Sequence, residues 1–211
     1  MSLWRTNSAA LAIGAQALTL DGKPLAAAAG DWPALAAELA QLLPARTRLS
    51  VELADVWVRY FLLDPPAGVN SLRDCRLLLP ARFEALYGHG AADWLLRADW
   101  QAGAPMLACA LPRALAQALA AFRPAQLVPA LLGAWNRSAR TLPASGAWCA
   151  AAHGQLTLLY WQDGRLRLVR QQRGQHAEGL LTLELTRLDA PLPPVRLWSG
   201  EAMPVGWGAL R

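Results

Sequence analysis

The feature that most constrains this chain is a local pattern that occurs twice: short strand-like segments joined by tight turns. In the first half, apolar residues 9–20 lead into the dipeptide Asp21-Gly22, which favours a tight turn between antiparallel strands. In the second half, residues 147–161 lead into Asp163-Gly164 at the same place in the pattern, and residues 165–171 follow. The repetition predicts two halves that each open with three short antiparallel strands.

A helix is predicted after the first set of strands. Asp31 can cap it, Pro33 suits its first turn, and leucines at helical spacing continue to residue 43. Residues 47–53 and 56–62 then alternate between apolar and polar side chains, as expected of strands. We interpret the two residues between them, Ala54-Asp55, as a hairpin turn.

The middle of the chain predicts a separate group of elements. Residues 70–87 show helical spacing, and because a proline inside a helix costs roughly 3 kcal/mol, Pro80 predicts a kink or two shorter helices. Residues 94–100 and 105–111 are predicted to form paired strands. A further helix is expected to start at Pro112.

The end of the chain is ambiguous in its periodicity. Residues 180–188 fit either a helix or a strand. We favour a helix, because a crossover is needed before the last predicted strand, residues 195–198. With this choice, both halves consist of three strands followed by a helix. The fold class predicted from the pattern is α/β with mixed sheets.

The formal net charge of +5 raises the question of an anionic partner. The arginines are scattered through the chain except for one group in a predicted strand and its turn: Arg165, Arg167, Arg170 and Arg173. This group is compatible with binding to nucleic acid or an anionic membrane surface. We favour the other interpretation, that this group forms the solvated face of one strand and its turn, and we expect no nucleic-acid partner.

Cysteine and histidine usage argues against a metal site. The chain has 3 cysteines and 3 histidines, and none of them form pairs at metal-ligand spacing. Neither a signal peptide nor an apolar run of the ~20 residues needed to cross a bilayer is present in the sequence. We therefore expect no metal, no cofactor, and a reducing, cytoplasmic location.

Three segments carry a resemblance to a known family. They are Leu77-Leu78-Leu79-Pro80-Ala81-Arg82-Phe83-Glu84-Ala85-Leu86, residues 106–115, and Phe122-Arg123-Pro124-Ala125-Gln126-Leu127-Val128-Pro129. They resemble a proline-broken helix, a strand leading into a helix, and a link to a second lobe in the PilM type IV pilus assembly proteins and the cytoplasmic part of the type II secretion protein GspL. Both groups belong to the actin/hexokinase superfamily.

The resemblance implies two ribonuclease-H-like, actin-like lobes. The segment from Pro143 to Gly146 is the predicted linker, so we expect a first lobe with an inserted α/β subdomain at residues 1–143 and a second, truncated lobe at 144–211. The family implies a scaffold at the inner face of the inner membrane that binds the cytoplasmic peptide of a single-span partner in a pilus or secretion system. A homo-oligomer is possible.

Active members of the superfamily need an acidic residue in each strand-turn-strand to hold magnesium. In this chain Ala12 stands at the first position, and residues 147–151 contain no acid at the second. Gly14, Ser199 and Gly200 are the predicted remnant of a nucleotide cleft, or simply tight-turn residues. We expect no catalytic residue, and the alternative is an actin-like ATPase with displaced acids.

The 10 tryptophans supply a further hypothesis. Trp57 and Phe61 lie opposite the valine-rich face of a predicted strand, with Arg59 between them. Aromatic and arginine side chains dominate binding energy at interfaces, so these three residues are predicted to contact the partner. The alternative is that helices cover both faces of the sheet.

Overall fold

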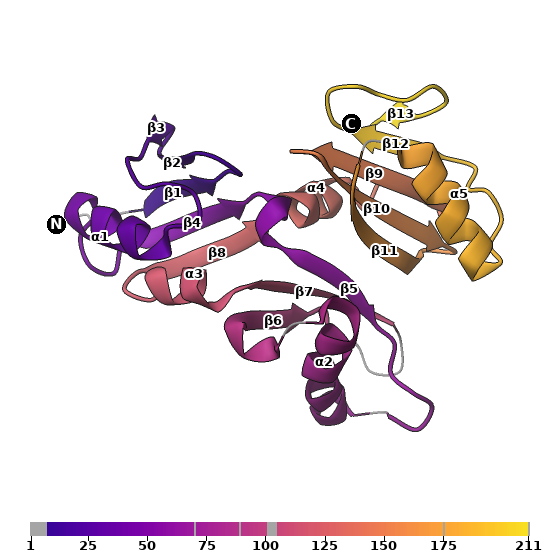
Figure 1. Cartoon of the computed structure of the whole chain (residues 1–211), viewed down its shortest axis with the longest axis horizontal. Helices are drawn as coiled ribbons and strands as arrows, with labels where there is room; N and C mark the ends of the chain where they lie inside the picture. Colours follow the sequence, from indigo (N-terminus) through magenta and orange to yellow (C-terminus); the bar gives the residue numbers. More distant parts are fainter. Residues whose placement is uncertain (1–7, 70, 89, 101–104, 175, 211) are drawn as a thin grey trace, which may run out of the picture. The chain divides into compact units, whose positions relative to one another are not determined.

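The computed structural model describes residues 8–69, 71–88, 90–100, 105–174 and 176–210 (Figure 1). The chain divides into two compact units. The first contains residues up to 58, 92–95 and 111–134, and the second contains 59–91, 96–110 and 135–211. These limits differ from the division at residue 143, which stays a prediction.

The first unit is built on a five-stranded mixed sheet with the order β3-β2-β1-β4-β8. Its strands are β1 (Ser8–Ile13), β2 (Leu18–Leu20), β3 (Lys23–Pro24), β4 (Arg48–Leu53) and β8 (Arg123–Pro129). β2 pairs antiparallel with both β1 and β3, whereas β4 runs parallel to β1 and to β8. The predicted three antiparallel strands are therefore present, although the third is shorter than expected.

Alternation of side chains explains why this sheet has one buried face. In β1 and β4 every second residue is buried, and Leu11 and Leu49 are almost completely inaccessible. Helix α1 (Trp32–Leu42) contributes Leu35 and Leu39 to the core. Its predicted cap is confirmed, because the Asp31 side chain accepts a hydrogen bond of 3.0 Å from the Ala34 amide. A short helix, α3 (Arg113–Ala118), contacts α1.

The predicted hairpin at Ala54-Asp55 is wrong. β4 already has β1 on one side and β8 on the other, so both of its edges are paired. The chain instead enters a single turn of 3₁₀-helix, η1 (Asp55–Trp57), where the Asp55 carboxylate accepts from the Leu131 amide at 3.1 Å. The next strand, β5 (Arg59–Leu63), belongs to a different sheet.

That second sheet has three strands in the order β5-β7-β6, with β7 at Met106–Pro112 and β6 at Trp94–Ala98. A 3₁₀ turn, η2 (Ala91–Asp93), precedes β6. Helix α2 (Leu72–Tyr87) contacts β5 and buries Cys75, Leu79 and Phe83, one residue per turn. The helix remains one element through Pro80, so the predicted division into two helices is wrong.

The third sheet repeats the strand order of the first: β11-β10-β9-β12-β13. Its strands are β9 (Gly146–Ala152), β10 (Gln155–Gln162), β11 (Arg165–Arg173), β12 (Arg196–Ser199) and β13 (Gly208–Ala209). β10 is antiparallel to β9 and β11, and β12 is parallel to β9 and β13. Helix α4 (Ala130–Ser138) precedes β9.

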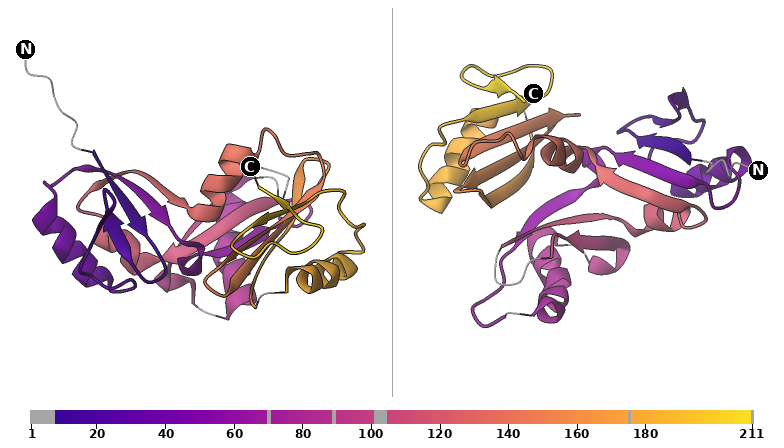
Figure 2. Two further views of the ribbon diagram at one scale, coloured as in Figure 1. Left: turned by 90° about the horizontal axis from the view of Figure 1, so that it is seen from above. Right: turned by 180° about the vertical axis from the view of Figure 1, so that it is seen from behind.

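The predicted helix before the last long strand is confirmed as α5 (Ala177–Leu188). Figures 1 and 2 show it along one face of the third sheet. Leu180, Leu181 and Leu185 pack there with Leu158 and Tyr160 of β10 in one buried cluster. The two five-stranded sheets therefore share one topology, three antiparallel strands followed by two parallel ones, of which the repeated pattern predicted the three antiparallel strands.

The hairpin turns predicted at Asp21-Gly22 and Asp163-Gly164 are confirmed, and a further tight turn lies at His153-Gly154. Asp21, Asp163 and His153 have positive φ angles of 50°, 53° and 51°, and each is followed by a glycine whose φ is also positive. Two successive positive φ values define the turn that matches the twist of antiparallel strands. Among the residues described, no helix combines the length and the apolar character needed to cross a membrane.

Candidate functional site

Gly14 lies in a tight turn, and both of its backbone polar groups form hydrogen bonds within the protein. Its amide donates to the Ala17 carbonyl at 2.9 Å, and its own carbonyl accepts from the Trp57 indole nitrogen at 2.8 Å. A Cβ at this position would come within 2.7 Å of the Ala17 oxygen. The tight turn explains why glycine is needed here. The Gly14 amide already donates its hydrogen bond to Ala17, so it is not available to bind a phosphate.

Ser199 and Gly200 follow β12 in the second unit. The Ser199 hydroxyl accepts a hydrogen bond of 3.0 Å from the indole of Trp148, which is buried in β9. Gly200 has φ +150°, and a Cβ there would lie 2.8 Å from the Ala151 carbonyl oxygen. Both residues thus hold the end of β12 tightly against β9.

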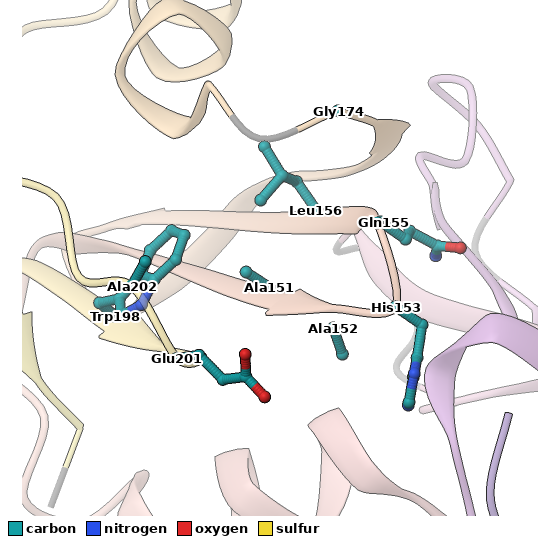
Figure 3. Close-up of a pocket in the computed structure, with 11 residues that line it drawn as sticks. Ala151, Ala152, His153, Gln155, Leu156, Gly174, Trp198, Glu201 and Ala202 are labelled. Carbon is teal, nitrogen blue, oxygen red and sulfur yellow. The ribbon is translucent and has the colours of Figure 1, made fainter.

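A pocket of about 710 Å³ lies at this end of the third sheet. It is lined by residues 151–156, Gly174, Trp198 and residues 200–202 (Figure 3). The lining therefore comes from the β9–β10 hairpin, the end of β11, and the turn after β12. A volume of this size is typical of sites for small molecules or single side chains with adjacent backbone. Of the predicted remnant residues, Gly200 lines this pocket.

The charges in this pocket do not suit a magnesium nucleotide. Among the described lining residues the ionisable side chains are His153 and Glu201, and none is lysine or arginine. A phosphate chain would lack a cation and would meet the Glu201 carboxylate. Ala12, at the first expected metal position, is an exposed alanine on β1. The residues described contain no cluster of three side chains able to hold a metal ion.

The three residues predicted to contact a partner lie in different surroundings. Trp57 is half-buried and meets Trp32 edge to face, with ring centroids 5.1 Å apart. Arg59 is half-buried at the start of β5. Phe61 is only 2% exposed and packs against Phe83 at 5.9 Å between ring centroids. Its burial contradicts the predicted recognition surface at this position and agrees with the alternative of a covered sheet.

The basic strand β11 does not present its arginines on one face. Side chains alternate along a strand, so Arg170 and Arg173 point to opposite sides. The register shift between Tyr160 and Trp161 leaves Arg167 outside the regular pairing. Arg170 also lies 3.6 Å from the buried Glu184 carboxylate of α5. This geometry agrees with a solvated strand rather than with a site for nucleic acid.

The described cysteines are buried and unsuited to chemistry. Cys75, Cys109 and Cys149 are all free thiols in the core. Burial raises the pKa of Cys109 to about 11 and that of Cys149 to about 12. Because the thiolate is the nucleophile and the metal ligand, the thiols of Cys109 and Cys149 stay protonated and inert near neutral pH.

Sequence reasoning missed two pocket residues, Trp198 and Glu201. Trp198 lies at the end of the predicted strand at residues 195–198, and Glu201 directly follows Ser199-Gly200. The available signal is Gly154, a residue that favours a turn, within the strand-like residues 147–161. In an α/β sheet, hairpin and strand ends at one edge gather the residues that can bind a ligand.

The duplicated sheet topology, with a pocket at the end of the second copy, defines the class of fold: an α/β protein with the actin-like ATPase fold. No family model matches the sequence, and no curated protein matches it. Solved structures do match. A protein of unknown function from Bacteroides thetaiotaomicron with an actin-like ATPase fold aligns with a TM-score of 0.59 at 8% identity, covering 96% of this chain and 86% of that one.

Two further structures match over nearly the whole chain. The cytoplasmic domain of EpsL, an inner membrane component of the type II secretion system of Vibrio cholerae, has a TM-score of 0.56 at 13% identity and covers 96% of this chain and 87% of that one. The PilM-PilN type IV pilus biogenesis complex contains a chain with a TM-score of 0.57 at 16% identity, covering 93% and 82%. The resemblance inferred from the sequence is confirmed at the level of the fold.

Proposed function

We propose that this chain is a non-catalytic cytoplasmic scaffold of a type IV pilus or type II secretion-like assembly system. In this role it binds the cytoplasmic peptide of a single-span inner-membrane partner. The observation that supports the proposal most strongly concerns the two strand-turn-strand segments with which an active member of this fold would hold a magnesium nucleotide. The two strand-turn-strand segments, residues 8–20 and 146–162, contain no acidic residue, and Gly14, Ser199 and Gly200 are used for internal contacts.

The local contacts support this assignment in each unit. In the first unit, the Gly14 amide and carbonyl are both hydrogen-bonded within the unit. In the second, Ser199 is engaged by Trp148 and Gly200 is needed for close packing on Ala151. Catalysis of phosphoryl transfer depends on positioned metal ions and on groups that neutralise developing charge. Residues 8–20 and 146–162 contain neither a carboxylate to hold a metal ion nor a lysine or arginine to neutralise charge.

The similar structures support the choice of system. One is a domain of an inner membrane component of type II secretion, and another comes from a complex of two pilus biogenesis proteins. Scaffolds of this kind recognise short peptides through grooves, pockets and sheet edges. A location at the inner face of the inner membrane belongs to the same proposal.

An actin-like ATPase with displaced acids is the alternative that must be excluded. Glu52 of β4 is the residue that would support it, because it lies beside Ala12 in the parallel register of β1 and β4 and its side chain is exposed. If Glu52 held the metal, Glu52→Gln would abolish nucleotide binding. The scaffold proposal expects no such binding to abolish.

The test measures two ligands on the same protein. The first is a labelled peptide with the sequence of the cytoplasmic segment of a candidate single-span membrane partner, and the second is a fluorescent ATP analogue with magnesium. Saturable one-to-one binding of the segment, and none of its scrambled version, is expected in fluorescence anisotropy. Saturable nucleotide binding that is lost in Glu52→Gln would refute the proposal, as would no binding of the segment.

A further inference from the structure

The pocket beside the β9–β10 hairpin has walls that allow a peptide backbone to approach closely. Ala151, Ala152, Gly154, Gly174 and Gly200 line it, and none carries more than a methyl group as side chain. Such walls leave main-chain groups accessible at the surface of the pocket. They suit an extended ligand that fills the space between them.

The charge in the pocket is opposite to that of the chain as a whole. The formal net charge is +5, yet the fixed charge among the described lining residues is the Glu201 carboxylate. Figure 3 shows this carboxylate directed toward the side of the pocket where Ala152 and His153 lie. Within the described part of the chain, Glu201 forms no ion pair or side-chain hydrogen bond, and because its side chain is exposed it is available to a cation.

A buried hydrogen-bond donor in the pocket also lacks an acceptor. Trp198 is 6% exposed and lines the pocket, and its indole nitrogen has no partner among the described residues. This nitrogen lies next to Gly200, where an added Cβ would be 3.3 Å from it. Buried donors are normally paired, so an acceptor from a ligand would complete the pocket.

Apolar side chains continue from the pocket along the loop that follows β12. Met203 is 52% exposed and Val205 is 99% exposed. The far end of this loop is fixed, because the Glu178 carboxylate accepts hydrogen bonds from Arg196 at 2.8 Å and from the Trp207 indole at 2.9 Å. An acidic pocket therefore lies next to an anchored, exposed apolar loop.

We propose that this pocket binds a lysine or arginine side chain of the membrane partner's cytoplasmic peptide, with Glu201 as the ion-pair acceptor and the Met203–Val205 loop as the apolar contact for a neighbouring residue. The inference rests on the proposed function. Cytoplasmic segments next to membrane spans are enriched in lysine and arginine, which matches the acidic pocket.

The experiment uses the full chain and the same labelled cytoplasmic segment, measured by anisotropy at a fixed salt concentration. Glu201→Lys reverses the pocket charge and is expected to weaken binding by about tenfold or more, while Glu201→Gln weakens it by roughly three- to tenfold. The matched control is Asp64→Lys, which makes the same change of charge at an exposed loop residue of the same unit. The control should alter binding by less than about twofold.

The outcomes separate this inference from the function on which it rests. If the segment binds but Glu201→Lys and Asp64→Lys behave alike, the pocket assignment is wrong and the scaffold proposal stands. A segment that still binds equally well after its lysines and arginines are replaced by glutamine also overturns the assignment. Magnesium ATP that competes with the segment, and binds better to Glu201→Lys, would show a nucleotide pocket instead. If the wild-type chain binds no segment, the proposed function itself fails.

Discussion

Replacing Phe61 by alanine tests most directly whether this residue is a recognition surface or part of the core. The ring is 2% exposed and packs against both Phe83 and Tyr87, with centroid separations of 5.9 and 6.3 Å. A surface aromatic contributes to binding and little to stability. A core aromatic contributes chiefly to stability, so the two roles predict different results.

The magnitude follows from the burial of the ring. A buried phenylalanine removes about 150–250 Å² from water, which at about 25 cal/mol per Å² corresponds to roughly 4–6 kcal/mol. Alanine retains part of this, and measured losses for such substitutions are about 3–5 kcal/mol. We therefore expect Phe61→Ala to lower the free energy of unfolding by about 4 kcal/mol. A surface position would change it by less than about 0.5 kcal/mol.

The assay is urea denaturation followed by far-ultraviolet circular dichroism and tryptophan fluorescence together. With an m value of about 2 kcal/mol per molar urea, the midpoint should fall by roughly 2 M. Phe61→Leu, which keeps most of the volume, provides a milder variant. Leu77→Ala is the control, because Leu77 of α2 is 71% exposed. A midpoint for Phe61→Ala within about 0.3 M of the wild-type value would refute the core assignment.

Two further predictions concern the turn after β1 and the buried thiols. Gly14→Ala should lower the free energy of unfolding by about 1–3 kcal/mol in urea titrations, because its Cβ would lie 2.7 Å from the Ala17 oxygen. The control is Gly90→Ala, whose Cβ meets open space and should change the free energy of unfolding by under about 0.5 kcal/mol. Equal effects of the two substitutions would contradict this reasoning. For Cys149, burial raises the pKa from 9.0 to about 12, so the unfolded chain loses the proton first and stability should fall as pH rises above about 9. Between pH 8 and 10.5 the wild type should therefore lose roughly 2 kcal/mol more than Cys149→Ala, and parallel pH profiles would show the shift to be absent.

Local patterns in the sequence determined most of the elements. Residues within a few positions of one another decide whether a segment alternates or repeats at helical spacing, and the Asp-Gly dipeptides fix two of the hairpin turns. The cap at Asp31 and the crossover helix α5 were predicted for the same reason. The repeated order of these elements, together with three short segments, was sufficient to predict the actin-like fold that the solved structures confirm.

The errors arose where the outcome depends on residues far apart in the chain. Whether β4 and β5 form a hairpin depends on β1 and β8, which already pair with both edges of β4. Alternation in residues 56–62 could not tell whether Phe61 faces solvent or α2. In the same way, the sequence allowed Gly14 to be either a remnant of a nucleotide cleft or a tight-turn residue. Only the tertiary contact with Trp57 shows that the Gly14 carbonyl already accepts a hydrogen bond.

For the candidate site as well, some features follow from the sequence alone and others only from the tertiary structure. The sequence by itself established that acidic residues are missing from both strand-turn-strand segments, since that requires only the order of residues. The tertiary structure decided that the β9–β10 hairpin and the turn after β12 enclose a pocket containing Glu201 and the unpaired Trp198 indole. The physical reason is that a pocket is formed by segments that meet only when the sheet assembles, here residues about 50 positions apart.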